Sequence, residues 1–200
     1  TAEKGLELKK QGHNPYTPVD ICMEALVANA TFVARSFAGD PKQVKELIKA
    51  AFSHRGIAVI DIISPCVTFH NHDESLHSYV YGKAHETPLH DITYVPAREE
   101  ITVEDFEQGS VREVELFDGS RLVLKKLESD YDPSNRWRAL AMMDEAEKSG
   151  ILLTGLIYVN TEQPSMYDLY NLPDEALNRM SSDRLRPTRE SIDALNASMF

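Results

Sequence analysis

Three side chains that can bind metals or attack substrates lie close together in DIISPCVTFHNHD, residues 61 to 73. Cys66 comes directly after Ser64-Pro65, where an apolar run stops, and His70 and His72 follow shortly. A thiolate can act as a nucleophile or a metal ligand, and a neutral imidazole can act as a base or a metal ligand. A cysteine that follows an apolar strand can equally be a buried core thiol. The sequence alone therefore leaves three interpretations of Cys66 open.

The histidines suggest a metal site as one hypothesis. His70 and His72 would share one face of an extended chain beside the carboxylates of Asp73 and Glu74, and such ligands suit zinc or iron. Their spacing matches no specific ligand motif, so a polar loop with solvated histidines is the simpler interpretation. Five of the seven histidines lie in this aperiodic region between residues 67 and 100: His70, His72, His77, His85 and His90.

Nucleophilic catalysis by Cys66 is a second hypothesis, because α/β folds place active residues after strands. The sequence identifies no partner base, and a lone cysteine in this position is more often a small buried hydrophobe. Cys22 lies in a mostly apolar expected helix, which favours core packing. The sequence also lacks GxGxxG, GxxxxGK[ST], GxSxG and HExxH, so the usual cofactor and hydrolase assignments have no motif to rest on.

Arginines offer a third kind of chemistry, the binding of an anion. They gather in NRWRAL, residues 135 to 140, and in SDRLRPTR, residues 182 to 189. No glycine-rich phosphate loop accompanies either segment, so surface salt bridges or subunit contacts are the favoured interpretation.

The elements that must position Cys66 form a helix–strand–helix–strand series over residues 20 to 66. Asp20 is a candidate cap for a helix over ICMEALVANA, and TFVARSF at 31–37 is typical of a short strand. Asp40 and Pro41 predict the N-cap and first residue of a helix over 41–55. The strand IAVIDIIS at 57–64 is almost wholly apolar, which indicates a parallel sheet covered on both faces. This order predicts an α/β crossover.

The second helix and its end carry two further expectations. Val44, Leu47, Ile48 and Ala51 recur at helical spacing and predict its buried face. Gly56 is expected to end the helix in a C′ position.

The remaining residues predict a hairpin, a helix and a strand. VREVELF and RLVLKKL flank Asp118-Gly119, a strong hairpin signal. A helix closed by Gly150 should follow, then the apolar strand ILLTGLIYVN, and a proline-marked tail whose last helix begins at Thr188. The expected organisation is an α/β domain over residues 1–85 and an extension over 86–200.

Composition narrows the function classes. The formal net charge of −11 argues against nucleic-acid binding, and two cysteines form no disulfide framework, which favours a cytoplasmic location. No apolar stretch approaches 18 residues and no signal peptide is visible, so neither a membrane span nor secretion is expected.

Several segments taken together resemble the β subunit of the 2-oxoacid:ferredoxin oxidoreductases, most closely the bacterial 2-oxoglutarate type. The shared features are the Ala-Thr-Phe-Val-Ala-Arg strand at 30–35, Gly-Asp-Pro at 39–41, and the strand end Ile-Asp-x-x-Ser-Pro-Cys-Val-Thr-Phe at 60–69. The later segments DGSRLVLKKLESDYDPSNRWRAL, LLTGLIYVN and LRPTRESIDALN resemble the carboxyl-terminal extension of bacterial members. The resemblance covers roughly residues 15–200.

The resemblance implies a fold, cofactors and partners. The fold would be part of a thiamine-diphosphate-binding α/β fold, a parallel sheet with crossover helices, followed by a hairpin–helix–strand extension. The complete subunit would bind thiamine diphosphate, Mg²⁺ and one 4Fe–4S cluster, and would work with an α subunit, ferredoxin, coenzyme A and a 2-oxoacid. Cys66 matches the Ser-Pro-Cys cysteine, one of the four cluster ligands. It would therefore be a metal ligand.

The chain also departs from the family pattern. It lacks the Cys-x-x-Cys, the third cysteine and the Gly-Asp-Gly-Asp segment that holds magnesium and diphosphate. We therefore expect the carboxyl-terminal half or two-thirds of a β subunit, without cofactor, cluster or turnover of its own. A parallel strand left at the cut edge would favour association with another chain. A non-enzymatic interaction module, a histidine metal-site protein and a pyruvate-specific relative remain alternatives.

Overall fold

The computed structural model describes residues 4–5, 7–8, 12–64, 78–97, 111–116, 118–126 and 131–199. The chain forms two compact units, residues 1–163 and 164–200. Cys66, His70, His72, Asp73, Glu74 and His77 lie outside the described residues.

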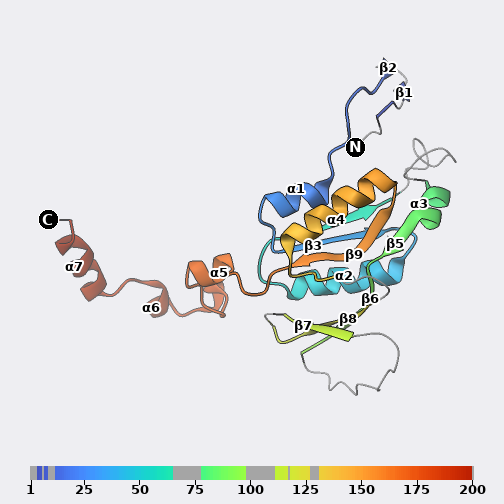
Figure 1. Ribbon diagram of the computed structural model, residues 1–200. Helices are drawn as coiled ribbons and strands as arrows, with labels where there is room; N and C mark the ends of the chain where they lie inside the picture. Colours follow the sequence, from blue (N-terminus) through green and yellow to red (C-terminus); the bar gives the residue numbers. More distant parts are fainter. Residues whose placement is uncertain are drawn as a thin grey trace. The chain divides into compact units, whose positions relative to one another are not determined.

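The first unit is built on a four-stranded sheet in the order β4-β3-β9-β5 (Figure 1). The strands are β3 (Phe32–Phe37), β4 (Ala58–Ile63), β5 (Glu86–Pro88) and β9 (Leu152–Val159). β3 and β4 are parallel, as the sequence predicts for a strand–helix–strand unit, and β5 and β9 are also parallel. β9 runs antiparallel to β3, so the sheet is mixed, and the expected parallel sheet is confirmed only in part.

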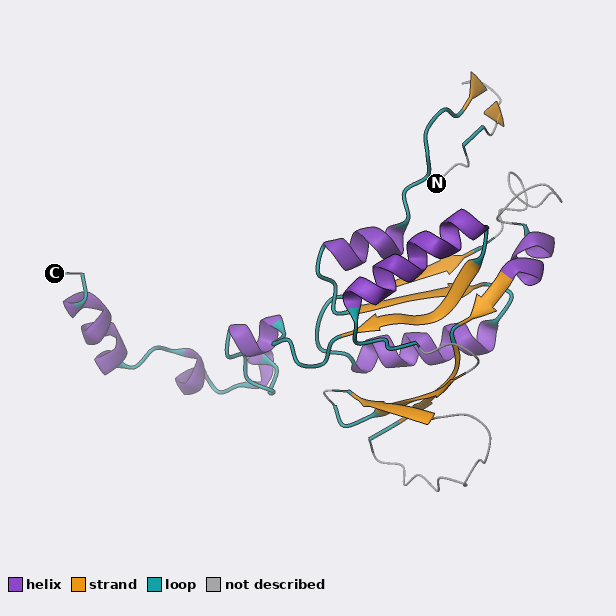
Figure 2. Cartoon of the chain, in the orientation of Figure 1, coloured by secondary structure: helices purple, strands orange, loops and turns teal. Residues whose placement is uncertain are grey.

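Helices cover the two faces of this sheet (Figure 2). α1 (Ile21–Val27) and α4 (Arg136–Ser149) pack on one face, and α2 (Pro41–Ser53) packs on the other. One core cluster contains Leu26, Val33, Met143 and Ile157, and the second contains Phe32, Leu47, Leu122 and Leu156. Each fully buried side chain of this size contributes about 1.5–3 kcal/mol of hydrophobic stabilisation.

A three-stranded antiparallel sheet in the order β6-β8-β7 contributes residues to the second core cluster. Its strands are β6 (His90–Val95), β7 (Val111–Glu115) and β8 (Arg121–Lys126). β7 and β8 form the hairpin predicted around Asp118-Gly119, and Gly119 has a φ of +77°, which suits glycine. β6 falls in the aperiodic histidine region, where the sequence predicts no strand. The short strands β1 (Glu7–Leu8) and β2 (Gly12–His13) pair separately.

Most helix boundaries follow the predicted caps. Asp20 accepts a hydrogen bond from the Met23 N–H, and Asp40 accepts one from the Gln43 N–H with Pro41 at the first helical position. Gly150 ends α4 in the left-handed conformation, with a φ of +66°. These caps satisfy backbone groups that a helix end otherwise leaves unpaired.

Two details of α2 differ from expectation. Its buried face consists of Gln43, Leu47 and Ala50, while Ile48 is exposed, because the helix is rotated toward β3 and the small sheet. The helix ends at Ser53 with an extended C-cap at His54, so the C′ role expected of Gly56 is wrong. Gly56 is needed for space instead, because a Cβ there would collide with the Thr31 hydroxyl and the His54 ring.

β4 lies at the edge of the sheet, and its side chains are half-buried or exposed. The expectation of a strand covered on both faces therefore fails within the described residues. Because parallel strands are normally buried, this edge is where an additional strand would pair. The expected association of the chain through this edge stays a prediction.

β9 contains a bulge and a glycine, and together they make room for the His90 ring. The register with β3 shifts between Val33 and Ala34, and Gly155 has a φ of +112°. A Cβ on Gly155 would lie 2.9 Å from His90 Cε1, so only glycine leaves room for the imidazole. The Leu156 N–H donates to His90 Nε2 at 3.1 Å, beyond the end of β5. At this point of β9, the His90 ring thus accepts the hydrogen bond that a neighbouring strand would otherwise accept.

Two buried histidines make stability depend on pH. Burial lowers the pKa of both His54 and His90 below the usual value for histidine. The unfolded chain therefore binds more protons than the folded chain below about pH 6.5, and protonated His90 cannot accept the Leu156 N–H. The free energy of unfolding should be constant above this pH and should fall as the pH drops toward 5, by up to about 1.4 kcal/mol per pH unit for each histidine.

Urea unfolding at a series of pH values measures this dependence. A variant with His54→Gln and His90→Gln should show a flatter profile between pH 7 and pH 5, whatever its absolute stability. A profile unchanged in this variant would contradict the assignment to these two histidines.

The second unit, residues 164–200, contains only short helices. They are α5 (Met166–Leu169), η1 (Leu177–Arg179), α6 (Ser182–Leu185) and α7 (Arg189–Ala197). Ser165 and Asp168 form a reciprocal capping box, and Thr188 caps α7, which begins one residue after the predicted start. None of these helices contains a buried residue.

β9 joins residues on both sides of the boundary expected near 85 and 86, because it pairs with β3 and with β5. By compactness, the chain divides into residues 1–163 and 164–200. The division of the parent subunit into a cofactor domain and an extension stays a prediction.

Candidate functional site

The candidate site lies at the carboxyl ends of the parallel strands β3 and β4, the edge where open α/β sheets place their ligands. β3 ends at Phe37 and β4 ends at Ile63, and the Ala38 N–H donates to the Ile63 carbonyl at 2.9 Å. The two strand ends therefore lie together. Ser64 is the last described residue before the segment that contains Cys66.

The chain returns from that segment to the same edge. Ser78 is buried and caps α3 (Tyr79–His85) by accepting the Tyr81 N–H at 3.0 Å. Gly82 lies against the Phe37 ring, since a Cβ there would be 2.7 Å from Phe37 Cε2. The Phe37 and Tyr79 rings also meet edge to face, with centroids 5.8 Å apart. α3 is thus anchored at the end of β3, so both flanks of residues 65–77 are fixed.

A chain of polar side chains crosses the core beside this edge. The Ser36 hydroxyl donates to Gln43 Oε1 at 2.7 Å, and Gln43 Nε2 donates to Thr154 Oγ1 at 3.4 Å. The Thr154 hydroxyl donates in turn to Glu86 Oε1 at 3.0 Å. The network ties β3, α2, β9 and the start of β5 together, and its buried members are all paired, which makes the arrangement specific.

Arg35, the residue before Ser36 in β3, connects three elements of the fold. Its Nη2 lies 2.7 Å from Asp20 Oδ2, and its Nε lies 3.0 Å from Asp61 Oδ2. Asp20 begins α1 and Asp61 lies in β4, while only a tenth of the Arg35 side chain is exposed. The two carboxylates neutralise the buried guanidinium, and the planar fork holds both at once. Arg35 thus fixes β4, the strand that leads to Cys66.

Cys22 is confirmed as a core residue. It is fully buried, and its thiol donates weakly to the Ala34 carbonyl at 3.6 Å. Burial raises the pKa of the Cys22 thiol to about 12, so no thiolate forms near neutral pH. It can serve neither as a nucleophile nor as a ready metal ligand.

The other candidate ligands are scattered. Within the described parts of the chain, no group of three or more histidine, cysteine, aspartate or glutamate side chains could hold a metal ion. His85 is exposed on α3, stacked on Tyr81, and His90 is a buried structural residue. The metal hypothesis for His70 and His72 lies outside the described residues.

The arginine segments make surface contacts. Arg136 donates to the Asn29 side chain, and its guanidinium lies 5.2 Å from the centre of the exposed Trp137 ring. Arg184 pairs with Glu175 at 2.6 Å. These contacts are the surface interactions favoured by the sequence.

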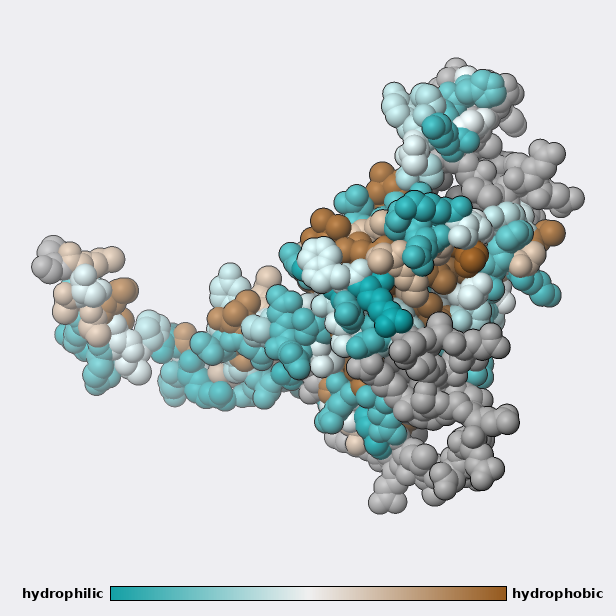
Figure 3. All heavy atoms as spheres, viewed as in Figure 1, coloured by the Kyte–Doolittle hydropathy of each residue, from teal (hydrophilic) through white to brown (hydrophobic). Residues whose placement is uncertain are grey.

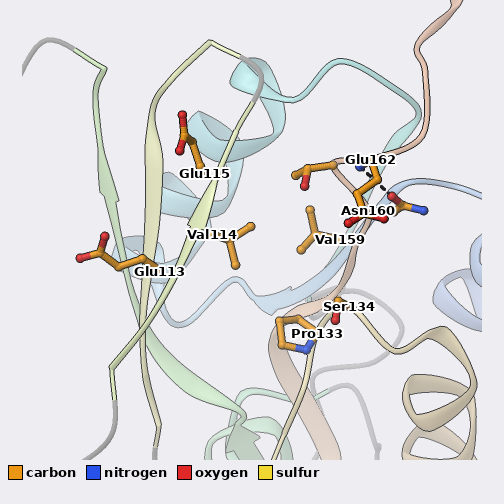
Figure 4. Close-up of a pocket in the computed structure, with 9 residues that line it drawn as sticks. Glu113, Val114, Glu115, Pro133, Ser134, Val159, Asn160 and Glu162 are labelled. Carbon is orange, nitrogen blue, oxygen red and sulfur yellow. Dashed lines mark hydrogen bonds between the residues drawn. The ribbon is translucent and has the colours of Figure 1, made fainter.

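A cleft of about 470 Å³ opens at the opposite end of the sheet, where β9 ends and β3 begins (Figure 4). Val114 and Val159 face one another there, while the carboxylates of Glu113 and Glu115 point away from them. Glu113 is also paired with Arg121 at 3.0 Å. The alternation along β7 therefore keeps two of the acidic groups from converging in the cleft. The sequence gives no signal for this cleft, and the side chains that line it suggest no specific chemistry.

Comparison with known proteins connects the fold to a class of enzyme subunit. No protein-family model matches the chain. A β subunit of an Aeropyrum pernix 2-oxoacid:ferredoxin oxidoreductase is 46% identical over 59 residues, 30% of this chain and 18% of that protein. The Saccharolobus solfataricus β subunit is 40% identical over 68 residues, 34% of this chain and 22% of that protein. The Mycobacterium tuberculosis 2-oxoglutarate oxidoreductase subunit KorB is 38% identical over 58 residues, 29% of this chain and 15% of that protein.

The fold is similar to that of a solved 2-oxoglutarate:ferredoxin oxidoreductase from Magnetococcus marinus, determined with 2-oxoglutarate, coenzyme A and succinyl-CoA bound. The TM-score is 0.57 at 22% identity, and the match covers 95% of this chain and 50% of that one. The resemblance seen in the sequence is confirmed: over partial regions, the homologues are β subunits of 2-oxoacid:ferredoxin oxidoreductases. The matched segments span less than a quarter of these three relatives.

Proposed function

We propose that this chain is the carboxyl-terminal part of the β subunit of a 2-oxoacid:ferredoxin oxidoreductase that uses 2-oxoglutarate. Such an enzyme decarboxylates the 2-oxoacid oxidatively, transfers the acyl group to coenzyme A, releases CO₂ and passes the electrons to ferredoxin. The observation that carries the proposal is the 38–46% identity to three such β subunits. The choice of 2-oxoglutarate is supported by the names of the Mycobacterium and Magnetococcus proteins.

Within this enzyme, Cys66 is proposed as one ligand of a 4Fe–4S cluster, which takes four cysteine thiolates. The chain has two cysteines, and the buried thiol of Cys22 is unsuited to the task. The residues present therefore do not fit a whole cluster, and this chain supplies at most one ligand. We assign the other ligands, and the thiamine diphosphate and Mg²⁺ site, to the rest of the subunit.

The task of the described residues is to position that ligand. Arg35 holds β4 against β3, and Phe37 with Gly82 holds α3 at the same edge, so both flanks of residues 65–77 are anchored. No helix in the described ranges is long and apolar enough to span a membrane. We place the enzyme in the cytoplasm, with an α subunit and ferredoxin as partners.

An anaerobic assay of the complete β subunit with its α subunit tests the proposal. Ferredoxin should be reduced only when 2-oxoglutarate and coenzyme A are both present, with release of CO₂, and pyruvate should support a slower reaction. The 200-residue chain alone should be inactive. Inactivity of the complete protein toward every 2-oxoacid would reject the proposal in favour of an interaction module, whereas a preference for pyruvate would correct the substrate.

A further inference from the structure

The second compact unit, residues 164–200, has secondary structure but no core of its own. Ser165 is its one buried residue among those described, and all residues of its four helices are exposed. Helices this short are marginal in water even when they are well capped. Side-chain N-caps begin α5 and α7, but no helix of the unit is buried, so the unit requires a surface to pack against.

The unit exposes enough apolar surface for a stable interface. Ten of its large hydrophobic side chains are between 44% and 71% exposed: Met166, Tyr167, Leu169, Tyr170, Leu172, Leu177, Leu185, Ile192, Leu195 and Met199. Hydrophobic residues, coloured brown, are visible on the surface of the unit in Figure 3. If each of these side chains exposes roughly 80 Å², the set exposes on the order of 800 Å² of apolar surface. One partner contributes about that area to a standard stable protein interface.

α7 presents its share of this surface as a stripe. Ile192 and Leu195 lie one turn apart, and Met199 continues the same face just beyond the last helical residue. This i, i+3, i+7 spacing is the pattern with which an amphipathic helix enters an apolar groove. Ala194 and Ala197 lie on the opposite face.

The charges indicate that the groove belongs to a protein and not to a lipid surface. The unit carries six acidic residues, four arginines and no lysine, although the chain has ten lysines. Membrane-surface helices carry several lysines and arginines on the polar face, whereas α7 has one arginine, Arg189, and two acidic residues, Glu190 and Asp193, away from its stripe. Protein interfaces are enriched in arginine and tyrosine and depleted in lysine, and the unit has this composition.

A second copy of the chain is a poor receiver. The other 163 residues carry 26 acidic and 17 basic side chains, so two copies would bring strongly acidic surfaces together. A different polypeptide can instead offer an apolar groove with hydrogen-bond acceptors at its rim for the arginines.

We infer that residues 164–200 are a docking arm that lies along an apolar groove of another polypeptide, with Ile192, Leu195 and Met199 inserted into it. The receiving polypeptide is the α subunit of the oxidoreductase, an assignment that rests on the proposed function. The α7 stripe is the anchor of this contact, because it is the longest helix of the unit.

The test measures the affinity of the complete β subunit for the α subunit, with the stripe changed. Ile192→Asp together with Leu195→Asp places two charges in the groove and should weaken binding at least about 30-fold. Ala194→Asp together with Ala197→Asp adds the same charges to the opposite face of α7 and should leave binding within about threefold. The two double variants should melt at the same temperature as each other, because both add two aspartates to the same helix.

The outcomes separate the docking arm from the enzyme assignment. Equal affinity for both double variants, or no complex with the wild-type subunit, overturns the docking arm. Loss of self-association in the stripe variant, without the α subunit present, also overturns it in favour of a second copy. A complex that depends on the stripe but oxidises no 2-oxoacid supports the docking arm and rejects the proposed function.

Discussion

Replacing Arg35 with methionine should lower the free energy of unfolding by about 3 kcal/mol, the low end of the range for breaking a buried ion pair. Methionine keeps most of the apolar stem but leaves Asp20 and Asp61 without their shared cation. Their side chains are only about a fifth exposed, so water compensates them poorly. The loss should also loosen β4 from β3 and α1, because Arg35 is the side chain that bridges all three.

Urea denaturation of the wild type and the variant measures this loss. Arg121→Met is the matched control, because the Arg121–Glu113 pair is about one-third exposed on both sides and should contribute no more than about 1 kcal/mol. If the two variants lost equal stability, the Arg35 cluster would not be the internal brace described above. Lysine at position 35 should restore only part of the loss, since an ammonium group cannot hold two carboxylates as a planar fork does.

Replacing Cys66 with alanine in the complete β subunit should abolish ferredoxin reduction. Loss of a residue that merely supports a metal ligand typically costs 10- to 100-fold, so loss of a ligand should cost more than about 100-fold. Iron and acid-labile sulfide should fall in parallel, while the complex with the α subunit should still form. Anaerobic purification followed by iron analysis and a ferredoxin-reduction assay gives both readouts.

Cys22→Ala is the matched control for this change. It removes the other thiol of the chain, but Cys22 is fully buried and its pKa is raised to about 12, so it cannot be a ligand. The control should lose some stability and keep its iron. Retention of the full iron content by Cys66→Ala would remove Cys66 from the ligand set.

The local parts of the fold could be predicted from the sequence because neighbouring residues determine them. Asp40 with Pro41, the Asp118-Gly119 turn, Gly150 and Thr188 each specify a boundary through their own backbone and side-chain chemistry. The parallel pairing of β3 with β4 also followed, since a strand, a helix and an apolar strand in series favour a crossover.

The long-range parts could not be predicted in the same way. An apolar strand such as β9 does not reveal its neighbours, so its position between β3 and β5, antiparallel to β3 and parallel to β5, comes from packing alone. The fit of His90 against Gly155 depends on residues 65 positions apart, and nothing near His90 announces it. The rotation of α2, which buries Gln43 instead of Val44, follows from the polar network with Ser36 and Thr154.

The candidate site was predictable only through family resemblance. Taken alone, Cys66 was compatible with a core thiol, a nucleophile or a ligand, and the segment that carries it lies outside the described residues. What the structure adds is its surroundings: β4 ends at the carboxyl edge of two parallel strands, and α3 returns to that edge. Arg35 also gains a role that its sequence position in the Ala-Thr-Phe-Val-Ala-Arg strand did not explain.

Electron paramagnetic resonance of the complete protein after substrate addition shows whether Cys66 holds a cluster that receives the electrons of the reaction. Addition of 2-oxoglutarate and coenzyme A under anaerobic conditions should produce the signal of a reduced 4Fe–4S cluster in the wild type and in Cys22→Ala. The same addition should produce no such signal in Cys66→Ala. A wild-type protein without a substrate-dependent signal, or a Cys66→Ala protein with an undiminished one, would show that Cys66 does not hold such a cluster.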